Sequence, residues 1–509
     1  MESGNELPRF PESYWTASVN RKTYKALDKD LTVDAVVVGG GIVGITSATL
    51  LAREGMRVAL IDGGRLLNGT TAHTTAKVTA QHDLIYDELI RSEGMEHALQ
   101  YYEAQKEALT FIQSTVQKGN IDCGWSMQDA YVYTNDEAEL DKLHKEAHAY
   151  EQLGIAGTFT ERIPLDIPVR GAVVMRQQAQ FHPLAYLNAL LDEFVSRGGM
   201  VFEDTTATDL DTGEPAVVIT GNGHRITASH VLQCTHFPYH DRIGFYFARM
   251  HVERSYVLGL KTSAPYPGGM YISSESPKRS IRDTQLADGS RLIILGGQSH
   301  KTGQDNCTIR HYEELQRYAR ETLGLTEVAY RWSAQDLVTG DKLPYIGRAS
   351  SSHPHVYAAT GFRKWGMTNG TLAALLLRDL ILERTNPYEQ LLSPSRSLSA
   401  KTLVSLVADN ADIAKQLISG KLDRGDKEIE DLGIDEGSVI RYNGKRAGAY
   451  RDPDGKLFLV DTTCTHMGCE VEWNNGERSW DCPCHGSRFS VTGEVMEGPA
   501  EEPLRRLTP

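Results

Sequence analysis

Two short segments near the C-terminus combine cysteine and histidine in a pattern that can hold a metal centre. Residues 464–469 read CTHMGC and residues 482–487 read CPCHGS, so they contain four of the seven cysteines of the chain. Thiolate sulfur and imidazole nitrogen are ligands for zinc and for iron. A structural zinc site would leave two cysteines and the final Gly-Ser pair unexplained. We therefore favour an iron–sulfur cluster over zinc.

Both segments resemble the cluster-binding loops of Rieske proteins, and the resemblance covers roughly residues 421–509. It implies that Cys464 and Cys482 are thiolate ligands of one iron of a [2Fe–2S] cluster, and that His466 and His485 are imidazole ligands of the other. Histidine ligation raises the reduction potential of such a cluster to about −150 to +300 mV. The module would then accept one electron at a time.

The same resemblance implies details around the cluster. As in the Rieske proteins of cytochrome bc-type complexes, Cys469 and Cys484 are expected to form a disulfide that restricts opening of the two loops. Ser487 is placed to donate a hydrogen bond to a bridging sulfide. Two residues later, high-potential relatives have a tyrosine that donates to a ligand sulfur, and this chain has Phe489. One donor fewer stabilises the reduced cluster less, so we expect a potential below the top of the Rieske range.

A nucleotide-binding pattern lies at the other end of the chain. The β-branched run of residues 33–38 is followed by a GxGxxG motif formed by Gly39, Gly41 and Gly44, then by a helical stretch and a second apolar strand that ends in Asp62. These glycines permit a tight turn, close approach of the backbone to a pyrophosphate, and close packing of helix on strand. Asp62 is expected to accept the ribose hydroxyls. The alternative is a glycine-rich turn in an ordinary βαβ unit.

The residues after Asp62 favour FAD as the dinucleotide. Residues 63–77 are small and rich in hydroxyl groups, and they resemble the loop that crosses the flavin in the D-amino-acid-oxidase and glycine/sarcosine-oxidase group of enzymes. Residues 356–368 resemble the strand, glycine turn and helix start beside the flavin in that group. The resemblance implies the following FAD contacts in addition to the GxGxxG motif: Thr70, Thr71, His73, Gly361, Gly366 and Met367.

This second resemblance covers roughly residues 30–385 and implies the fold. We expect an α/β FAD-binding domain of the Rossmann type, glutathione-reductase-like, with an interleaved mixed-sheet substrate domain, followed by a small all-β Rieske domain. The predicted boundaries are residues 30–390 for the FAD-dependent oxidoreductase part, 391–420 for a linker helix and 421–509 for the Rieske domain.

His73 has two interpretations. The run Gly-Thr-Thr-x-His that ends at His73 resembles the segment of dimethylglycine and sarcosine dehydrogenases in which a histidine bonds covalently to the flavin, with Ala72 in place of tryptophan. Covalent attachment would suit delivery of electrons to a Rieske acceptor. The alternative is a noncovalent loop histidine that packs against the flavin.

Three residues are candidates for contact with a substrate. Arg363 and Lys364 occupy the turn on which related enzymes place a cation for a substrate carboxylate, and Arg363 could bind a carboxylate in a bidentate manner. The alternative is a surface cation whose stem packs on Trp365. Tyr256 lies, together with Arg254, in the strand region that lines the pocket in relatives.

The amino-acid composition disfavours some classes of binding partner. The 509 residues carry a net charge of −14, which disfavours nucleic acid and anionic membrane surfaces. No apolar stretch is long enough for a transmembrane helix. The first residues are polar and acidic without a signal-peptide core, so we expect a cytoplasmic protein.

These features together predict a flavin-dependent dehydrogenase. It would oxidise a small amine or amino acid and pass electrons singly through the cluster to an external acceptor, either a protein or a quinone-like molecule. Two alternatives remain. The chain could be an electron-transfer or reductase component with reverse electron flow, or a redox sensor whose flavin pocket has lost catalysis.

Overall fold

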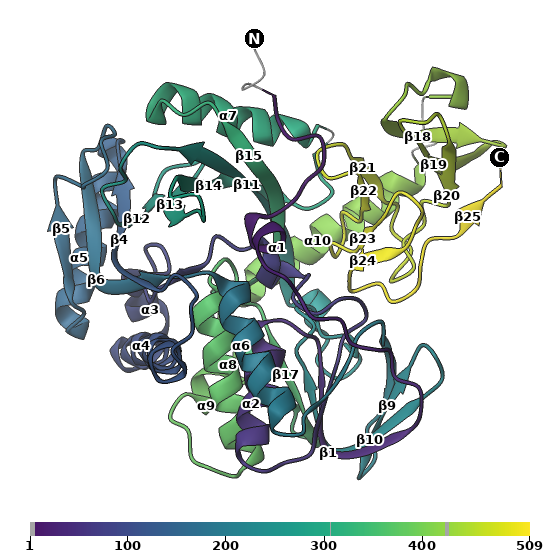
Figure 1. Cartoon of the computed structure of the whole chain (residues 1–509), viewed down its shortest axis with the longest axis horizontal. Helices are drawn as coiled ribbons and strands as arrows, with labels where there is room; N and C mark the ends of the chain where they lie inside the picture. The colour runs from purple at the N-terminus through teal and green to yellow at the C-terminus, as the bar shows by residue number, and fades with distance from the viewer. Residues whose placement is uncertain (1–5, 306, 423–426, 509) are drawn as a thin grey trace.

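A computed structural model describes residues 6–305, 307–422 and 427–508 (Figure 1). Its first sheet has eight strands in the order β16-β17-β10-β1-β2-β7, with β9 paired to β10 and β8 paired to β9. The central strands pair in parallel, and β1 is buried on both faces along the valine run 36–38. The strands are β1 (Leu31–Val38), β2 (Val58–Ile61), β7 (Met200–Phe202), β8 (Ala207–Asp211), β9 (Ala216–Thr220), β10 (Arg225–Gln233), β16 (Tyr345–Ser350) and β17 (His353–Thr360).

Three helices pack beside this sheet. The helix α2 (Ile42–Arg53) follows the GxGxxG turn and lies against both α6 (Pro183–Ser196) and α8 (Gly366–Ile381). Almost every residue of α8 is buried, so this apolar helix belongs to the core. Among the described residues, no helix is long and apolar enough to cross a membrane.

The second sheet has nine strands in the order β15-β11-β14-β13-β12-β4-β6-β3, with β5 attached to β6. The β12–β4 pair is parallel and the other pairs are antiparallel, which confirms the predicted mixed sheet. The strands are β3 (Lys77–Val78), β4 (Ser126–Thr134), β5 (Gly157–Thr160), β6 (Gly171–Gln180), β11 (Met250–Thr262), β12 (Met270–Ser273), β13 (Arg279–Gln285), β14 (Arg291–Lys301) and β15 (Val328–Thr339).

Helices surround this second sheet at both ends. Figure 1 shows α3 (Tyr86–Glu93), α4 (Met95–Gly119) and α5 (Leu140–Leu153) near β4 and β6, and α7 (Ile309–Leu323) over the other end. The helix α7 packs on β11 and β14. Two further short helices are α1 (Tyr14–Ser18), which contacts α6, and α9 (Glu389–Leu392), which contacts β16 of the first sheet.

The C-terminal domain, residues 427–508, contains two four-stranded antiparallel sheets and confirms the predicted all-β fold. The long helix α10 (Ala400–Leu422) precedes it. Residues 423–426 and Pro509, which the predicted Rieske boundaries include, lie outside the described residues. The strands are β18 (Glu436–Tyr442), β19 (Lys445–Arg451), β20 (Leu457–Val460), β21 (Glu472–Asn474), β22 (Ser479–Asp481), β23 (Arg488–Phe489), β24 (Val495–Glu497) and β25 (Arg506–Leu507).

Candidate functional site

A large cavity of about 1180 Å³, here called the central cavity, is lined by both large sheets and by the C-terminal domain. Its wall contains the GxGxxG turn, the loop after β2, the cavity-facing side of β11, the turn before α8, and residues 495–501. Of the predicted FAD contacts, the following line the wall: Gly39, Gly41, Asp62, Thr70, Thr71, His73, Gly366 and Met367. Gly44 and Gly361 lie outside this lining.

Packing explains the three glycines of the turn. Gly39 has a positive φ of +109°, and a Cβ there would lie 2.5 Å from the carbonyl oxygen of Cys234. A Cβ on Gly44 would lie 1.8 Å from the oxygen of Gly39, so only glycine allows α2 to approach the turn. Gly41 caps α2 without a side-chain hydrogen bond, and the first turn of α2 lines the cavity. The positive end of the helix dipole therefore faces the cavity, as pyrophosphate binding requires.

Asp62 shapes this turn as well as lining the wall. Its carboxylate accepts hydrogen bonds from the backbone N–H groups of Gly40 (2.7 Å) and Gly64 (2.9 Å). Burial raises the pKa of Asp62, although these two N–H groups oppose that effect. Asp62 therefore couples the end of β2 to the GxGxxG turn, a role that the sequence pattern alone did not suggest.

The loop that carries His73 is held by two indole groups. Residues Thr70–His73 form a short 3-10 helix, and Trp332 Nε1 donates to the carbonyl oxygen of His73 at 2.9 Å. Trp15 Nε1 donates to the carbonyl oxygen of Thr74 at 2.7 Å. His73 Nδ1 lies 2.9 Å from the Gly69 oxygen, and burial lowers the pKa of His73. The neutral ring then donates through Nδ1, so a covalent bond to flavin would have to use Nε2.

The positive charge of Lys364, on the cavity wall, is balanced by neighbouring acidic side chains. Its ammonium group donates to Asp336 Oδ2 (2.9 Å), Ser255 Oγ (2.8 Å) and Ser299 Oγ (3.0 Å), and it forms an ion pair with Glu253 at 3.2 Å. The two acids raise the pKa of Lys364 in spite of burial. Lys364 is therefore a charged group already surrounded by acceptors, which makes it a poor partner for a substrate carboxylate.

Arg363 differs from its neighbour. Its Nη1 is buried and has no hydrogen-bond partner among the described residues, while its backbone N–H donates to Leu337 O. Burial and the charge of Arg363 lower the pKa of His82 to about 3, so the guanidinium lies near this buried imidazole. His82 stacks on Trp365 with 4.8 Å between ring centroids. Arg363 is thus a half-buried cation on the cavity wall, and its buried Nη1 has no partner among the described residues.

Tyr256 lines the central cavity together with Glu253 and Ser255 of the same strand. Its side chain is fully buried, its hydroxyl lies 3.0 Å from His300 Nε2, and its ring stacks on His311 of α7 with a centroid separation of 4.7 Å. The pairing of β11 with β14 shifts register between Arg254 and Tyr256, so simple alternation of side chains does not hold there. A catalytic role for Tyr256 stays a prediction.

Sequence reasoning missed the acidic side of the pocket and one buried lysine. The alternation of polar residues at positions 251, 253 and 255 was the signal that could have identified Glu253. Lys77 also lines the cavity, where its ammonium group donates to the carbonyl oxygen of Tyr271 at 2.7 Å. Burial, followed by the nearby charge of Arg282, lowers the pKa of Lys77 to about 7.

The four predicted cluster ligands converge in the C-terminal domain. The thiols of Cys464 and Cys482 are buried and within hydrogen-bond reach of each other. The rings of His466 and His485 are perpendicular, with 5.0 Å between their centroids. His466 Nδ1 and His485 Nε2 are buried and without partners among the described residues. Two thiols and two imidazoles with free ring nitrogens fit the donor set of a Rieske cluster.

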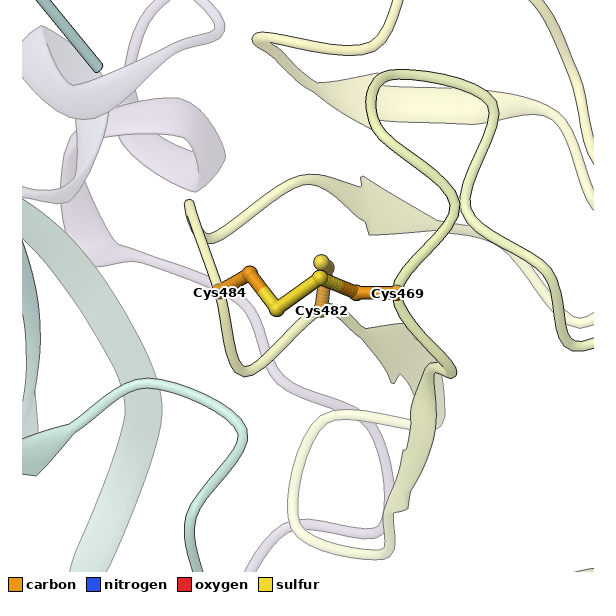
Figure 2. Close-up of side chains that lie close together, drawn as sticks. All are labelled: Cys469, Cys482 and Cys484. Carbon is orange, nitrogen blue, oxygen red and sulfur yellow. A yellow bond between two sulfur atoms is a disulfide. The ribbon is translucent and has the colours of Figure 1, made fainter. Parts of the chain in front are cut away.

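The remaining two cysteines of the segments form a disulfide, Cys469–Cys484 (Figure 2). Figure 2 shows the Cys482 side chain beside this bond, and the three sulfur atoms lie within 4.8 Å of one another. The sulfur atoms of a disulfide are not thiolates and do not serve as ligands here. Cys482 and Cys464 therefore remain as the two thiolate ligands for the metal. Ser487 hydrogen-bonds to Cys464 and accepts the N–H of Ala500 at 3.0 Å.

Comparisons with known proteins agree with this geometry. A family model described as FAD dependent oxidoreductase matches residues 34–380, and a model of the Rieske [2Fe-2S] domain matches residues 426–508. A putative Rieske 2Fe-2S iron-sulfur protein, YhfW, of Bacillus subtilis (strain 168) is 49% identical over 98% of this chain and 97% of its own length.

A more distant relative and a solved structure of similar fold each cover about three quarters of the chain. Gamma-glutamylputrescine oxidoreductase of Escherichia coli (strain K12) is 24% identical over 74% of this chain and 90% of its own length. The crystal structure of glycine oxidase from Geobacillus kaustophilus superposes with a TM-score of 0.61 and 20% identity, covering 72% of this chain and all of that one. The chain therefore belongs to the family of FAD-dependent oxidoreductases and carries a C-terminal Rieske [2Fe–2S] domain.

Proposed function

We propose that the protein is a dehydrogenase that oxidises a small amine or amino acid and passes the electrons singly through the Rieske cluster to an external acceptor. The observation that carries this proposal is the wall of the central cavity, which both the FAD-binding part and residues 495–501 of the Rieske domain build. FAD supplies removal of two electrons from a C–H bond next to nitrogen, and the cluster carries one electron at a time. The acceptor would be a protein or a quinone-like molecule.

The chain's own residues hold the two cofactors in this proposal. The turn at Gly39 and the start of α2 receive the pyrophosphate, and Asp62 the ribose. The remaining FAD contacts are Thr70, Thr71, His73, Gly361, Gly366 and Met367. The cluster is held by Cys464, His466, Cys482 and His485, with the Cys469–Cys484 disulfide beside it.

The charges on the cavity wall suit a zwitterionic or cationic substrate. Arg363, with its unpaired buried Nη1, would bind a substrate carboxylate. Glu253 and Asp336 carry two negative charges against the single positive charge of Lys364, and this excess complements a substrate ammonium group. The names of the two distant relatives, a gamma-glutamylputrescine oxidoreductase and a glycine oxidase, support the same substrate class.

Aromatic side chains lie between the cavity and the cluster ligands. Phe237 lines the cavity, and its ring centroid is 6.5 Å from that of His466. Phe247 lies 5.5 Å from His485 and 6.2 Å from His466. The histidine side of the cluster site therefore faces the FAD-binding part, which supports electron transfer in that direction.

An anaerobic visible spectrum of the purified protein tests the proposal. Amines, amino acids and NAD(P)H are added in turn while the flavin and cluster bands are followed. We expect one amine or amino acid to bleach the flavin and then the cluster. Bleaching by NAD(P)H alone would favour the reductase alternative, and response to dithionite alone across a broad substrate panel would favour the redox sensor.

A further inference from the structure

The Rieske domain meets the central cavity through one strand, the loop that follows it, and the residues Glu477 and Arg488. Residues 495–501, which comprise β24 and the loop after it, line the cavity together with the GxGxxG turn and His73. Within this segment, Glu497 lies near His73 and His236. Burial tends to raise the pKa of Glu497, but the charges of Arg254 and Arg488 lower it below its usual range. The cluster domain is therefore part of the wall of the flavin site.

Arg254 is the central contact between the two parts. It lies on β11 with a side chain that is 0% exposed. Its Nη1 donates to Ser333 Oγ at 2.9 Å, and its Nη2 donates to Gln335 Oε1 at 3.0 Å, both on β15. The same Nη2 donates to Glu497 Oε2 of the Rieske domain at 3.2 Å. One guanidinium thus joins two strands of the large sheet to the cavity-lining segment of the cluster domain.

Several charged side chains surround this contact, and each arginine pairs with more than one carboxylate. Arg488 pairs with Glu497 (3.2 Å), Glu477 (3.1 Å) and Asp481 (3.4 Å), all within the Rieske domain. Two arginines therefore face three carboxylates in this interdomain network. Loss of Arg254 would leave one arginine for these three acids, of which Glu477 and Asp481 are buried, and an uncompensated buried charge is strongly unfavourable. The pairs of Arg488 lie within the Rieske domain, so the ion pairs of Arg254 with Glu497 and Asp481 are the part of the network that requires the domain to stay docked.

Close packing ties the docked position to the cluster. Gly486 follows the predicted ligand His485, and a Cβ on Gly486 would lie 2.6 Å from Val252 of β11 and 2.9 Å from Gln335 of β15. Gln335 is also an acceptor for Arg254. Gln335 therefore accepts a hydrogen bond from Arg254 and also lies against Gly486 of the cluster loop.

We infer that Arg254 is a positioning residue that holds the Rieske domain against the flavin site in one fixed arrangement, so that electrons pass from FAD to the cluster within one chain without domain movement. The inference rests on the proposed function. In each step the flavin, already reduced by the substrate, would give up one electron and release its proton to solvent, and one iron of the cluster would be reduced from Fe(III) to Fe(II). The external one-electron acceptor reoxidises this iron before the second electron follows.

The test compares Arg254→Met with Arg9→Met in the full-length holoprotein. Arg9 also joins the two parts, through Asp435 at 3.1 Å, but its side chain is 54% exposed and Asp435 keeps Arg478 as a partner. The first readout is hydrogen–deuterium exchange of residues 495–501. The second is the rate at which the cluster band bleaches as the flavin band recovers after flash photoreduction with a deazaflavin.

We expect Arg254→Met to accelerate exchange in residues 495–501 and to slow cluster reduction at least tenfold, while Arg9→Met changes neither. Arg254→Lys keeps the charge but cannot make all three hydrogen bonds, so it should give a smaller change of the same sign. If Arg254→Met does not fold, the transfer rate of Arg254→Lys tests the inference instead. An unchanged transfer rate in a folded Arg254 variant with intact cluster absorbance overturns the inference. If no electron passes between the cofactors in the wild-type protein, the proposed function fails, and exchange alone still reports whether Arg254 holds the domain.

Discussion

The two cofactor sites of this protein are built in opposite ways. The cluster site comes from two loops within residues 464–487 of one small domain, and it depends on the chemistry of a few side chains. The central cavity collects segments from residue 11 to residue 501, among them the glycine-rich turn at residues 39–41. We expect the local cluster site to lose its cluster completely when one ligand is replaced. The distributed FAD site should instead lose affinity for FAD gradually, by an amount that depends on how badly each new side chain clashes with its neighbours.

Replacement of a cluster ligand should have the largest effect. Cys482→Ser removes a buried thiolate donor, and we expect complete loss of the cluster's absorbance and EPR signal with FAD still bound. Cys307→Ser is the control, because Cys307 is free and lies outside the two segments. A Cys482→Ser protein that keeps a full cluster would contradict the ligand assignment and with it the contrast between the sites.

The turn of the nucleotide site should be the next most sensitive feature. Gly44→Ala places a Cβ 1.8 Å from the Gly39 oxygen, so α2 must move away from the turn that receives the pyrophosphate. We expect FAD affinity to fall by at least an order of magnitude, measured by release of flavin fluorescence on dilution. Gly64→Ala is matched, because it also lies on the cavity wall but its Cβ meets no atom within 4 Å. Equal affinity of the two variants would contradict the steric explanation.

The same contrast explains what the sequence could predict. The cluster ligands and the GxGxxG turn are runs of neighbouring residues whose spacing carries the chemistry, and both follow from the printed sequence. The group of Glu253, Asp336 and Lys364 joins residues far apart in the chain, so its formation depends on how β11, β15 and the turn before α8 pack. No local pattern records such an arrangement.

Tyr256 shows what a resemblance can supply and what it cannot. The resemblance placed Tyr256 beside the pocket, but the contact of its hydroxyl with His300 and the register shift between Arg254 and Tyr256 depend on how β11 packs against β14. The contacts of Arg254 with the Rieske domain were equally invisible, because they require the position of a second domain.

The disulfide should stabilise the cluster loops without being required for the ligands themselves. It closes a loop with a sequence separation of 15, and the chain-entropy model assigns such a cross-link about 3 kcal/mol. For the double variant Cys469→Ala/Cys484→Ala we expect the cluster to assemble but to be lost at lower urea concentration, followed by cluster absorbance. Urea resistance equal to that of the wild type would show that packing of the domain, rather than the cross-link, holds the loops.

Arg363 tests the substrate side of the central cavity. A hydrogen bond to a charged group contributes about 1.5–3 kcal/mol, so Arg363→Met should lower kcat/KM for an amino-acid substrate by roughly tenfold to a hundredfold. The internal control is an amine of the same skeleton without a carboxylate, whose kcat/KM should change little. Equal losses for both substrates would show that Arg363 maintains the pocket near His82 instead of binding a carboxylate.

The smallest expected effect concerns a residue that is not a ligand. Phe489 is fully buried and pairs with Trp480 across β22 and β23, at the position where high-potential relatives carry a tyrosine. Phe489→Tyr adds one hydroxyl donor, which stabilises the reduced cluster, so its midpoint potential should become more positive by tens of millivolts in an EPR-monitored titration. Phe458→Tyr, on the half-buried face of β20, is the matched control and should leave the potential unchanged. A positive shift confined to Phe489→Tyr would show that single neighbours tune the cluster, as its local construction implies, whereas no shift would mean that the new hydroxyl does not reach a ligand sulfur.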